Sequence, residues 1–559
     1  MLNTDDPPAT KSASSISPLL LGGLPFIVFA LLLLHTAWEK SPTFDEVGYI
    51  GLGAYLLESG KWDVPAAASH PPLAYYLHSL PALLYPLDPQ HWRYDDSIER
   101  DDIRWLRAAD VDRGNAILLD PAYDGEFFFF LCRSTSLVFA ALLFYLLYHW
   151  SIQIQGQFLL ALLLLALSPN ILAHAALINT DFIFTVTFLL TVYTFRHLLL
   201  QPSWRNLSLA GFSLGLALLS KLSALILLPV LGALLLWFIV CARQDNKKNL
   251  VTFWPGSNLW TCGIALYATI VLAGFLTLWA GYGFQLTPYL LVVRSQLWDL
   301  SGGHQAYLAG AYSTEGWWYY YPVAALIKTP LPTLILAGLG LACLIRRSDR
   351  LELGFLLLPP LLLSAVFIVI GSKNIGLRYL LPAYPFLFLV AATALPSLTS
   401  TAAWRKYLVG LLCLWYIVGA ARIHPHHLAY FNEAIGGPQN GYRYLVDSNL
   451  DWGQDLKGLK KYMDERGITR IKLSYFGTVD PALYDLDYDW LPSYMLHRPS
   501  DTEVILPTTG LIAISATNLT GVYMDMYGYG KTLYDWLWQR QPIAQIGYSI
   551  FIYDLPQPP

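Results

Sequence analysis

Long apolar runs alternate with short polar connections from residue 19 to residue 422. Because a helix needs roughly 20 apolar residues to cross a bilayer, this pattern predicts a polytopic α-helical membrane protein with about eleven transmembrane helices. The predicted spans are Leu19–Ala37, Phe127–Trp150, Phe158–Ala176, Phe182–Leu200, Leu207–Leu219, Leu222–Val240, Leu259–Ala280, Tyr320–Ile345, Leu353–Ile370, Tyr379–Leu398 and Tyr407–Ala421. The fifth and sixth would together measure about 51 Å as one helix, against a hydrocarbon core about 30 Å thick. Lys221, which separates them, is therefore expected to mark a turn at the membrane surface.

The cationic connections predict how these helices are oriented. Arg and Lys residues occur on alternate connections, at 196–205, 243–248, 346–350 and 405–406. Since cytoplasmic loops carry the excess of Lys and Arg, these connections and the tail 1–18 are expected in the cytoplasm. The opposite face then holds the loop 38–126, the turn 179–181, the loops 281–319 and 371–378, and the segment 423–559.

The first outer loop and the C-terminal segment are expected to be folded. Val47–Leu57 and Leu73–Leu84 have helical spacing with few charges, which predicts helices that lie in the membrane interface. The transmembrane domain would then comprise 19–422, including the structured loop 38–126. In the last segment a helical pattern begins at Leu456. Strand-like runs follow at Ile471–Phe476, Leu511–Ser515 and Ile546–Tyr553. Residues 423–559 are therefore predicted to form an extracytoplasmic α/β domain, long enough to bury its own core.

Composition agrees with a membrane location. Of the 559 residues, 55% are hydrophobic and only 13% are charged, whereas soluble proteins carry about 25% charged residues. The net charge of -4 and the lack of a basic run argue against nucleic acid as a partner. The five cysteines show no CxxC spacing, so neither a disulfide framework nor a zinc site is indicated.

A tandem acid directly follows the first predicted span. Asp45 and Glu46 lie where a membrane surface meets water, and His70-Pro71-Pro72-Leu73 follows in the same loop. Two adjacent carboxylates suit a general base with a supporting acid, because deprotonating an acceptor hydroxyl needs an anion within hydrogen-bond reach. They equally suit a hard divalent cation, and solvated loop acids are the structural alternative. Asp181, at a tight turn, suits an active-site role or the N-cap of the next helix.

Arg133 lies about two turns inside an otherwise apolar span. A charge inside the membrane is costly and usually faces a partner or a cavity. An ion pair with Asp45 or Glu46 would satisfy it. These polar groups map to the outer ends of the spans, whereas a transporter more often places its key polar residues near the middle of the membrane. A belt at one interface suits an enzyme whose substrate has a lipid tail and a polar head.

A second group of cations lies in the predicted outer loop 371–378. Lys373 and Arg378 stand there with two glycines. Arg and Lys on a flexible backbone are what a phosphate needs, although anchors that snorkel to the interface explain such cations as well. The cluster His424-Pro425-His426-His427 is a candidate metal site that lacks acidic partners.

Taken together, these motifs resemble the GT-C membrane glycosyltransferases, in particular family 39. That family includes the protein O-mannosyltransferases and the aminoarabinose transferase that modifies lipid A. The resemblance rests on Asp45-Glu46, His70-Pro71-Pro72-Leu73, Asp181, Lys328-Thr329-Pro330-Leu331-Pro332 and Arg378-Tyr379-Leu380-Leu381-Pro382, in that order. It covers about residues 15–420. The stretch from Tyr430 to Asp455 is similar to a tail found in bacterial members, which favours a bacterial inner membrane.

The resemblance implies a polyprenyl-phosphate-linked sugar donor and a protein, lipid or glycan acceptor. The acceptor hydroxyl would attack the anomeric carbon in one inverting displacement. Asp45 would act as the base, and Glu46 and Asp181 would hold the acceptor or the base. No cofactor is implied with certainty, and a divalent cation at the carboxylates is left open.

The leaving group in such a reaction is a phosphate, which is stable as an anion. It needs no general acid, but it does need positive charge on its oxygens. The candidates are Lys373, Arg378, His70 and Arg133. The aminoarabinose transferases have a Lys where this chain has His70, and the HPPL form is nearer the O-mannosyltransferases.

Two other functions fit a polytopic chain with an outer domain. A transporter or flippase of lipid-linked intermediates would need a polar path through the spans, where the sequence shows only scattered Ser and Thr. A receptor whose tail binds glycan or peptide would need no catalytic carboxylate at all.

Overall fold

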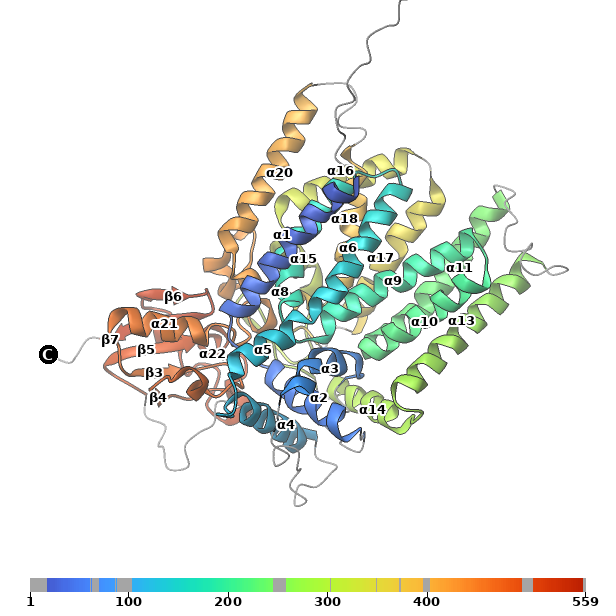
Figure 1. The fold of residues 1–559 in the computed structure, drawn as a ribbon. Helices are drawn as coiled ribbons and strands as arrows, with labels where there is room; N and C mark the ends of the chain where they lie inside the picture. The colour runs from blue at the N-terminus through green and yellow to red at the C-terminus, as the bar shows by residue number, and fades with distance from the viewer. Residues whose placement is uncertain are drawn as a thin grey trace, which may run out of the picture.

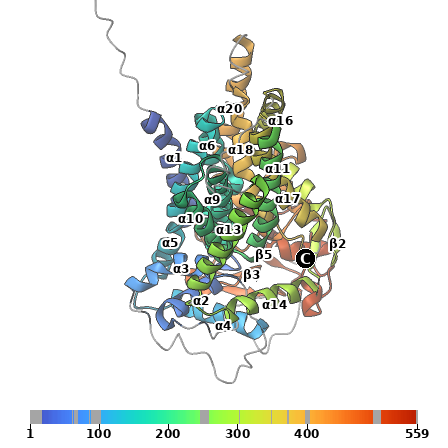
Figure 2. The same ribbon diagram turned by 90° about the vertical axis from the view of Figure 1, so that its right-hand side faces the viewer.

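The computed structural model describes residues 18–60, 62, 70–85, 87, 103–244, 258–301, 303–347, 349–370, 373–395, 403–494 and 506–555. The predicted cytoplasmic tail up to residue 17, Lys247 and Lys248 lie outside them. A bundle of long helices forms the body of the molecule, and a smaller layer of short helices and a sheet covers one of its ends (Figures 1 and 2). The bundle consists of α1 (Pro18–Glu39), α5 (Gly125–Ser134), α6 (Ser136–Gln153), α7 (Phe158–Ala166), α8 (Pro169–Ala175), α9 (Thr180–Leu200), α10 (Trp204–Ser220), α11 (Leu227–Gln244), α13 (Leu259–Gly281), α15 (Tyr320–Lys328), α16 (Leu331–Arg346), α17 (Arg350–Ile370), α18 (Tyr384–Ala392) and α20 (Ala403–Ile423).

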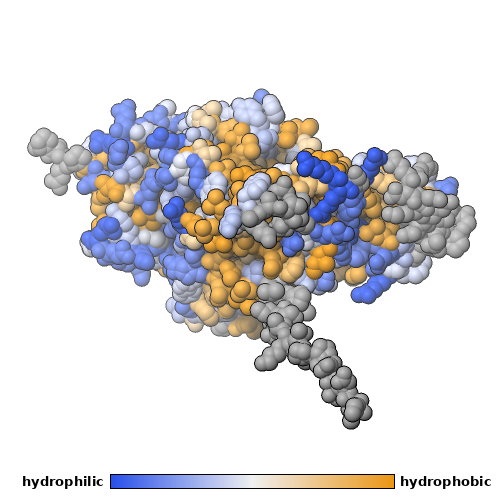
Figure 3. Space-filling view, turned by 90° about the horizontal axis from the view of Figure 1, so that it is seen from above, coloured by the Kyte–Doolittle hydropathy of each residue, from blue (hydrophilic) through white to orange (hydrophobic). Residues whose placement is uncertain are grey.

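The outward faces of the bundle are apolar. Val369 is 84% exposed and Val138 is 67% exposed, which is costly in water but expected of side chains that face lipid. In Figure 3, orange apolar residues cover much of the middle of the molecule, and blue residues gather towards both sides. The prediction of a polytopic α-helical membrane protein is therefore confirmed.

The number of spans is less regular than the predicted eleven. Among the described residues, six helices are long and apolar enough to cross a membrane, or eight if two bent helix pairs are each counted as one span. The pair α7–α8 bends by 58° and the pair α15–α16 by 107°. Shorter apolar helices cover the runs that begin at Tyr379 and Tyr407. The exact count stays a prediction.

The predicted span Tyr320–Ile345 is not one straight helix. Helix α15 ends at Lys328, and Thr329 is extended at φ -92° and ψ 133°. Pro330 follows directly, and a proline disfavours the helical conformation of the residue before it. Helix α16 therefore starts in a new direction.

The predicted turn at Lys221 is confirmed. Helix α10 ends at Ser220 and Lys221 is extended, so the chain does turn there. The Lys221 side chain is buried within the protein, and its level relative to the membrane surface stays a prediction. The side chain pairs with Asp181, as described below.

The first outer loop forms helices at the covered end of the bundle. They are α2 (Glu46–Ser59), α3 (Leu73–His78) and α4 (Ile103–Leu118), with the 3-10 helix η2 (Leu80–Leu84) after α3. Helices were predicted over the first two of these ranges, and this is confirmed. Helix α14 (Thr287–Ser301) lies at the same end, beyond α13 (Figure 1).

The C-terminal α/β domain is built on a five-stranded sheet in the order β4-β3-β5-β7-β6. The strands are β3 (Ile471–Ser474), β4 (Tyr488–Trp490), β5 (Gly510–Ser515), β6 (Ala544–Ile546) and β7 (Ile550–Leu555), and α21 (Leu456–Arg466) packs beside them. Strand β3 is parallel to β4 and β5, whereas β7 is antiparallel to β5 and β6. The run Ile546–Tyr553 was predicted as one strand but forms parts of two, because Gly547 and Tyr548 turn the chain with positive φ angles. Before α21 the chain makes short 3-10 turns, the last being η9 (Asp447–Asn449).

Candidate active site

The segment after α1 brings Asp45 to the start of α2, at the covered end of the bundle. Its backbone is tied to the C-terminal domain, since Ser41 N donates to Gln454 O at 3.0 Å and Phe44 N donates to Trp452 O at 2.8 Å. Asp45 occupies the N-cap position of α2 without making a side-chain capping bond. Its carboxylate is 32% exposed, which leaves it accessible to a substrate.

Arg378 joins two carboxylates from distant parts of the chain. It lies in the 3-10 helix η5 (Leu377–Ala383). Its Nη1 atom is 3.4 Å from Asp45 Oδ2 and 3.6 Å from Asp181 Oδ2. The predicted convergence of Asp45, Asp181 and Arg378 at one end of the bundle is therefore observed.

Asp181 is held by a second cation. Lys221 Nζ lies 2.5 Å from Asp181 Oδ1, and both side chains are less than a tenth exposed. The N-cap of α9 is Asn179, whose side chain accepts from the N–H groups of Asp181 and Phe182. The alternative of Asp181 as that N-cap is thus wrong, and its carboxylate is available for the two cations.

Aromatic rings enclose the cations of this site. The Arg378 guanidinium lies 4.4 Å from the centre of the Trp452 ring, and Lys221 Nζ lies 4.4 Å from that of Tyr379. Such contacts strengthen when water is excluded. Within the described part of the chain, Arg378 Nε is buried and has no hydrogen-bond partner. A buried donor without a partner is costly to the folded protein.

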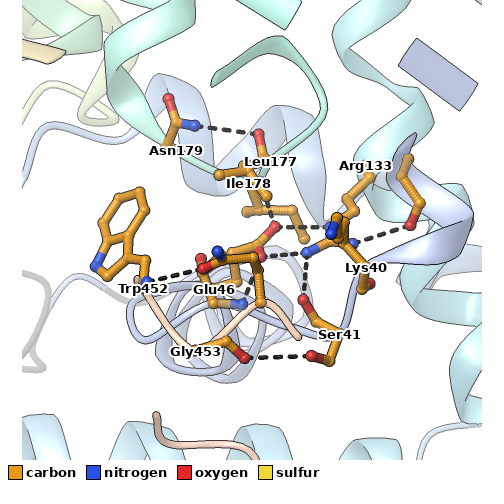
Figure 4. Close-up of polar contacts among 12 residues, drawn as sticks. Lys40, Ser41, Glu46, Arg133, Leu177, Ile178, Asn179, Trp452 and Gly453 are labelled. Atoms are coloured by element: carbon orange, nitrogen blue, oxygen red, sulfur yellow. Dashed lines mark hydrogen bonds and ion pairs between the residues drawn. The ribbon is translucent and has the colours of Figure 1, made fainter. Parts of the chain in front are cut away.

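Glu46 and Arg133 form a separate, closed clamp (Figure 4). Arg133 Nε and Nη2 donate to the two carboxylate oxygens of Glu46, and the remaining N–H groups donate to the carbonyl oxygens of Ala37, Lys40 and Ser41. A guanidinium has five N–H donors, and all five are used. Arg133 therefore has none left for a phosphate, and its assignment to the donor phosphate is corrected.

The Glu46 carboxylate is equally engaged. Besides Arg133, it accepts from Thr43 N at 2.7 Å and from Ile178 N at 2.6 Å. An ionised carboxylate offers about four lone-pair sites, and four donors occupy them. The fully buried Glu46 holds the segment after α1 against α5 and the turn before α9, so it is not placed to act as a second catalytic acid or to share a cation with Asp45.

Lys373 and His70 occupy the rim of this region. Lys373 Nζ donates to Gln296 Oε1 of α14 at 3.2 Å, and its carbonyl oxygen accepts from the Tyr321 hydroxyl. The His70 ring packs against Tyr49 of α2, with 5.9 Å between the ring centres. Their role in holding the donor phosphate stays a prediction.

The histidines after α20 lie at a different junction. His424 Nδ1 is 3.0 Å from His427 Nε2, and His426 contacts Lys40, which pairs with Asp455 at 2.5 Å. Within the ranges that the structure describes, no three His, Cys, Asp or Glu side chains are arranged to hold a metal ion. These contacts give the histidines a structural role between α1, α20 and the C-terminal domain.

Sequence reasoning missed Trp452 as a member of the site and placed Lys221 at the surface. Trp452 belongs to the polar stretch Asp447-Ser448-Asn449-Leu450-Asp451-Trp452-Gly453-Gln454, which is unusual in being almost entirely buried. A Trp amid polar residues carries no signal of its own without its partner Arg378, which lies far away in the sequence.

Known proteins resemble parts of this chain. Residues 126–272 match the family model described as dolichyl-phosphate-mannose-protein mannosyltransferase. The matched segment contains Arg133, Asp181 and Lys221. No curated protein sequence matches the chain.

Among solved structures, ArnT from Cupriavidus metallidurans bound to undecaprenyl phosphate aligns with 12% identity and a TM-score of 0.42, over 95% of this chain and 97% of that one. The apo structure of ArnT from the same organism aligns with 15% identity and a TM-score of 0.41, over 81% and 73%. The sequence motifs and the match over residues 126–272 agree with each other. They support the predicted resemblance: residues 126–272 are similar to the dolichyl-phosphate-mannose-protein mannosyltransferases.

Proposed function

We propose that this protein transfers a sugar from a polyprenyl-phosphate donor to an acceptor hydroxyl, at the end of the bundle that carries the C-terminal domain. The observation that carries the proposal is the position of Asp45, whose carboxylate is 32% exposed and lies 3.4 Å from Arg378. A base and an anion-binding cation side by side are what this transfer needs. The family match of residues 126–272 supports the same class of reaction.

In the proposed reaction the acceptor oxygen forms a bond to the anomeric carbon while the bond between that carbon and the phosphate oxygen breaks. The hydroxyl proton passes to the Asp45 carboxylate, and the electron pair of the broken bond leaves with the polyprenyl phosphate. A single displacement of this kind inverts the anomeric centre. Arg378 stabilises the charge that develops on the leaving phosphate.

In this proposal Asp181 and Lys221 orient Arg378. Asp181 lies behind the guanidinium at 3.6 Å and is itself neutralised by Lys221 at 2.5 Å. The Asp181–Lys221 pair therefore orients Arg378 without cancelling its charge. Lys373 and His70, at the rim, would meet the donor as it enters from the bilayer, and the outer face of a bacterial inner membrane is the expected location.

The position of these residues favours an enzyme over a transporter. Asp45, Asp181 and Arg378 all lie at one end of the bundle, whereas transporter sites lie near the middle of the membrane between repeats. The flippase alternative gains no support from this placement.

The test is transfer by the purified full-length protein from radiolabelled polyprenyl-phosphate hexose or pentose to extracted membranes. We expect the wild-type protein to release polyprenyl phosphate, and Asp45→Asn to lose at least about a hundredfold in rate, since a positioned base contributes roughly 10²–10⁴. Asp487→Asn is the matched control, because Asp487 is exposed and contacts only Arg470 at 3.6 Å among its described ion pairs. Wild-type turnover by Asp45→Asn would overturn the assignment of the base.

A further inference from the structure

Residues 447–454 form a buried connecting segment, here called the strap, between α20 and the first helix of the C-terminal domain. Connections normally run over the surface because their backbone needs water. The strap contains Asp447, Asn449 and Asp451, yet none of these side chains is more than 8% exposed. Its polar groups must therefore find partners in the protein. Asp447 accepts from the Tyr523 hydroxyl and Asp451 from Thr517 N, both in the C-terminal domain, whereas Asn449 reaches the segment that carries Arg378.

The first half of the strap holds the loop that carries Arg378. Asn449 Oδ1 accepts from Leu377 N at 2.9 Å, and the Ser448 hydroxyl donates to Ile375 O at 2.8 Å. The two chains approach so closely that a Cβ atom at Gly376 would lie 2.3 Å from Ser448 Oγ. The backbone on the N-terminal side of Arg378 is thus fixed by the C-terminal domain.

The first half of the strap is also held by the buried side chain of Lys328. Lys328 Nζ donates to the carbonyl oxygens of Leu428, Tyr430 and Asn449. An ammonium satisfied by three carbonyl groups is stable in a buried position only while all three remain in place. The strap is therefore not free to move away from α15.

The second half of the strap holds the segment that carries Asp45. Phe44 N donates to Trp452 O at 2.8 Å. Ser41 contacts the two residues that follow Trp452: its N–H donates to Gln454 O, and its hydroxyl donates to Gly453 O at 3.2 Å. Figure 4 shows the contact of Ser41 with Gly453. Asp45 follows directly after the bonded Phe44.

Trp452 takes part in both contacts. Its carbonyl oxygen fixes the residue before Asp45, and its ring lies 4.4 Å from the Arg378 guanidinium. We propose that Trp452 is a positioning residue that sets Arg378 against Asp45, and that the C-terminal domain is thereby an integral part of the active site rather than a separate binding module. This inference rests on the proposed function, in which Arg378 holds the donor phosphate.

The experiment compares Trp452→Ala, Trp452→Leu and Trp452→Phe in the full-length protein, with separate measurement of KM for the polyprenyl-phosphate sugar and of kcat. Loss of a cation–π contact of this kind is expected to raise KM roughly 3- to 30-fold, with Trp452→Phe recovering most of the loss because it retains an aromatic face. Trp538→Ala is the control, since Trp538 lies in the same domain but stacks on Tyr442, with 5.2 Å between the ring centres.

Each outcome decides the inference. If Trp452→Ala lowers the midpoint of thermal unfolding, Trp452→Leu, which preserves apolar volume without a π face, provides the comparison. A KM raised by Trp452→Leu and restored by Trp452→Phe supports the positioning role. Unchanged KM and kcat in Trp452→Leu, while Asp45→Asn abolishes transfer, would overturn the inference and leave the proposed function standing. Wild-type transfer by Asp45→Asn would instead overturn the assignment of Asp45 as the base in the proposed function.

Discussion

Removing one partner of the Glu46–Arg133 clamp should strongly destabilise the protein. Both side chains are at most 1% exposed, and losing one member of such a pair leaves an uncompensated buried charge that costs about 3–5 kcal/mol. In Arg133→Met, Glu46 keeps only its bonds from Thr43 N and Ile178 N. In Glu46→Gln, Arg133 keeps its bonds to three carbonyl oxygens. We therefore expect Arg133→Met to lower the free energy of unfolding by about 4 kcal/mol, and Glu46→Gln by somewhat less.

The double variant is the sharper measurement. In Glu46→Gln combined with Arg133→Met no buried charge remains unpaired. The free energy of unfolding should therefore fall by less than the sum of the two single decreases, by at least about 1 kcal/mol. The assay is unfolding of the purified protein by dodecyl sulfate in mixed micelles, followed by circular dichroism. Lys460→Met is the control, because the Lys460–Asp464 pair is exposed and such pairs contribute at most about 1 kcal/mol. If each single variant lowered the free energy of unfolding by less than about 1 kcal/mol, and the two decreases added in the double variant, the stabilising role of the clamp would be refuted.

Two further predictions concern stability. Burial raises the pKa of Asp451 to about 7, against hydrogen bonds from Thr517 and Gly453 that lower it. The folded state therefore retains a proton that the unfolded state loses near pH 4, so stability falls as the pH rises from about 4 to about 7. Thermal unfolding of Asp451→Asn should show a weaker decline over this range, and parallel curves would contradict the assignment. In the packing of α10 on α13, a Cβ atom at Gly215 would lie 2.3 Å from Thr277 Cβ. Gly215→Leu should cost about 1–3 kcal/mol in the micelle assay, whereas Gly338→Leu, which meets open space, should cost little; equal effects would contradict the close packing.

The fold was largely predictable because span length and apolarity are local properties of the chain. Hydropathy located the helices but could not show that the run Tyr320–Ile345 bends by 107°, since Thr329 and Pro330 lower the average hydropathy very little. The stereochemistry of the residue before proline contained that information. The order of the cationic loops likewise predicted that the C-terminal sheet and helices α2–α4 gather at one end, as both ribbon views show.

The site was predictable in part. Asp45, Asp181 and Arg378 converge as expected, because each follows a span boundary on the same predicted side. The sequence did not predict that Asp45 and Glu46 contact different cations. Successive helical residues point about 100° apart, so at the start of α2 one carboxylate faces Arg378 and its neighbour faces Arg133.

Contacts over long sequence separations explain what was missed. Lys221 and Asp181 stand 40 residues apart, and nothing in the local pattern around Lys221 predicts a buried cation. Trp452 meets Arg378 only because the strap passes between two halves of the site. Such contacts are set by the packing of whole elements and not by the residues adjacent in sequence.

The proposed roles of Asp45 as the base and of Arg378 as the phosphate-binding cation are tested most directly by measuring donor binding and turnover in the same preparations. Binding of polyprenyl phosphate and release of polyprenyl phosphate from the labelled sugar donor would be followed for the wild type, Asp45→Asn and Arg378→Met. The account predicts that Asp45→Asn binds polyprenyl phosphate at least as tightly as the wild type but does not turn over, whereas Arg378→Met loses binding by roughly tenfold or more, as expected for a charge-assisted contact of about 1.5–3 kcal/mol. Full binding by Arg378→Met, or turnover by Asp45→Asn, would contradict it.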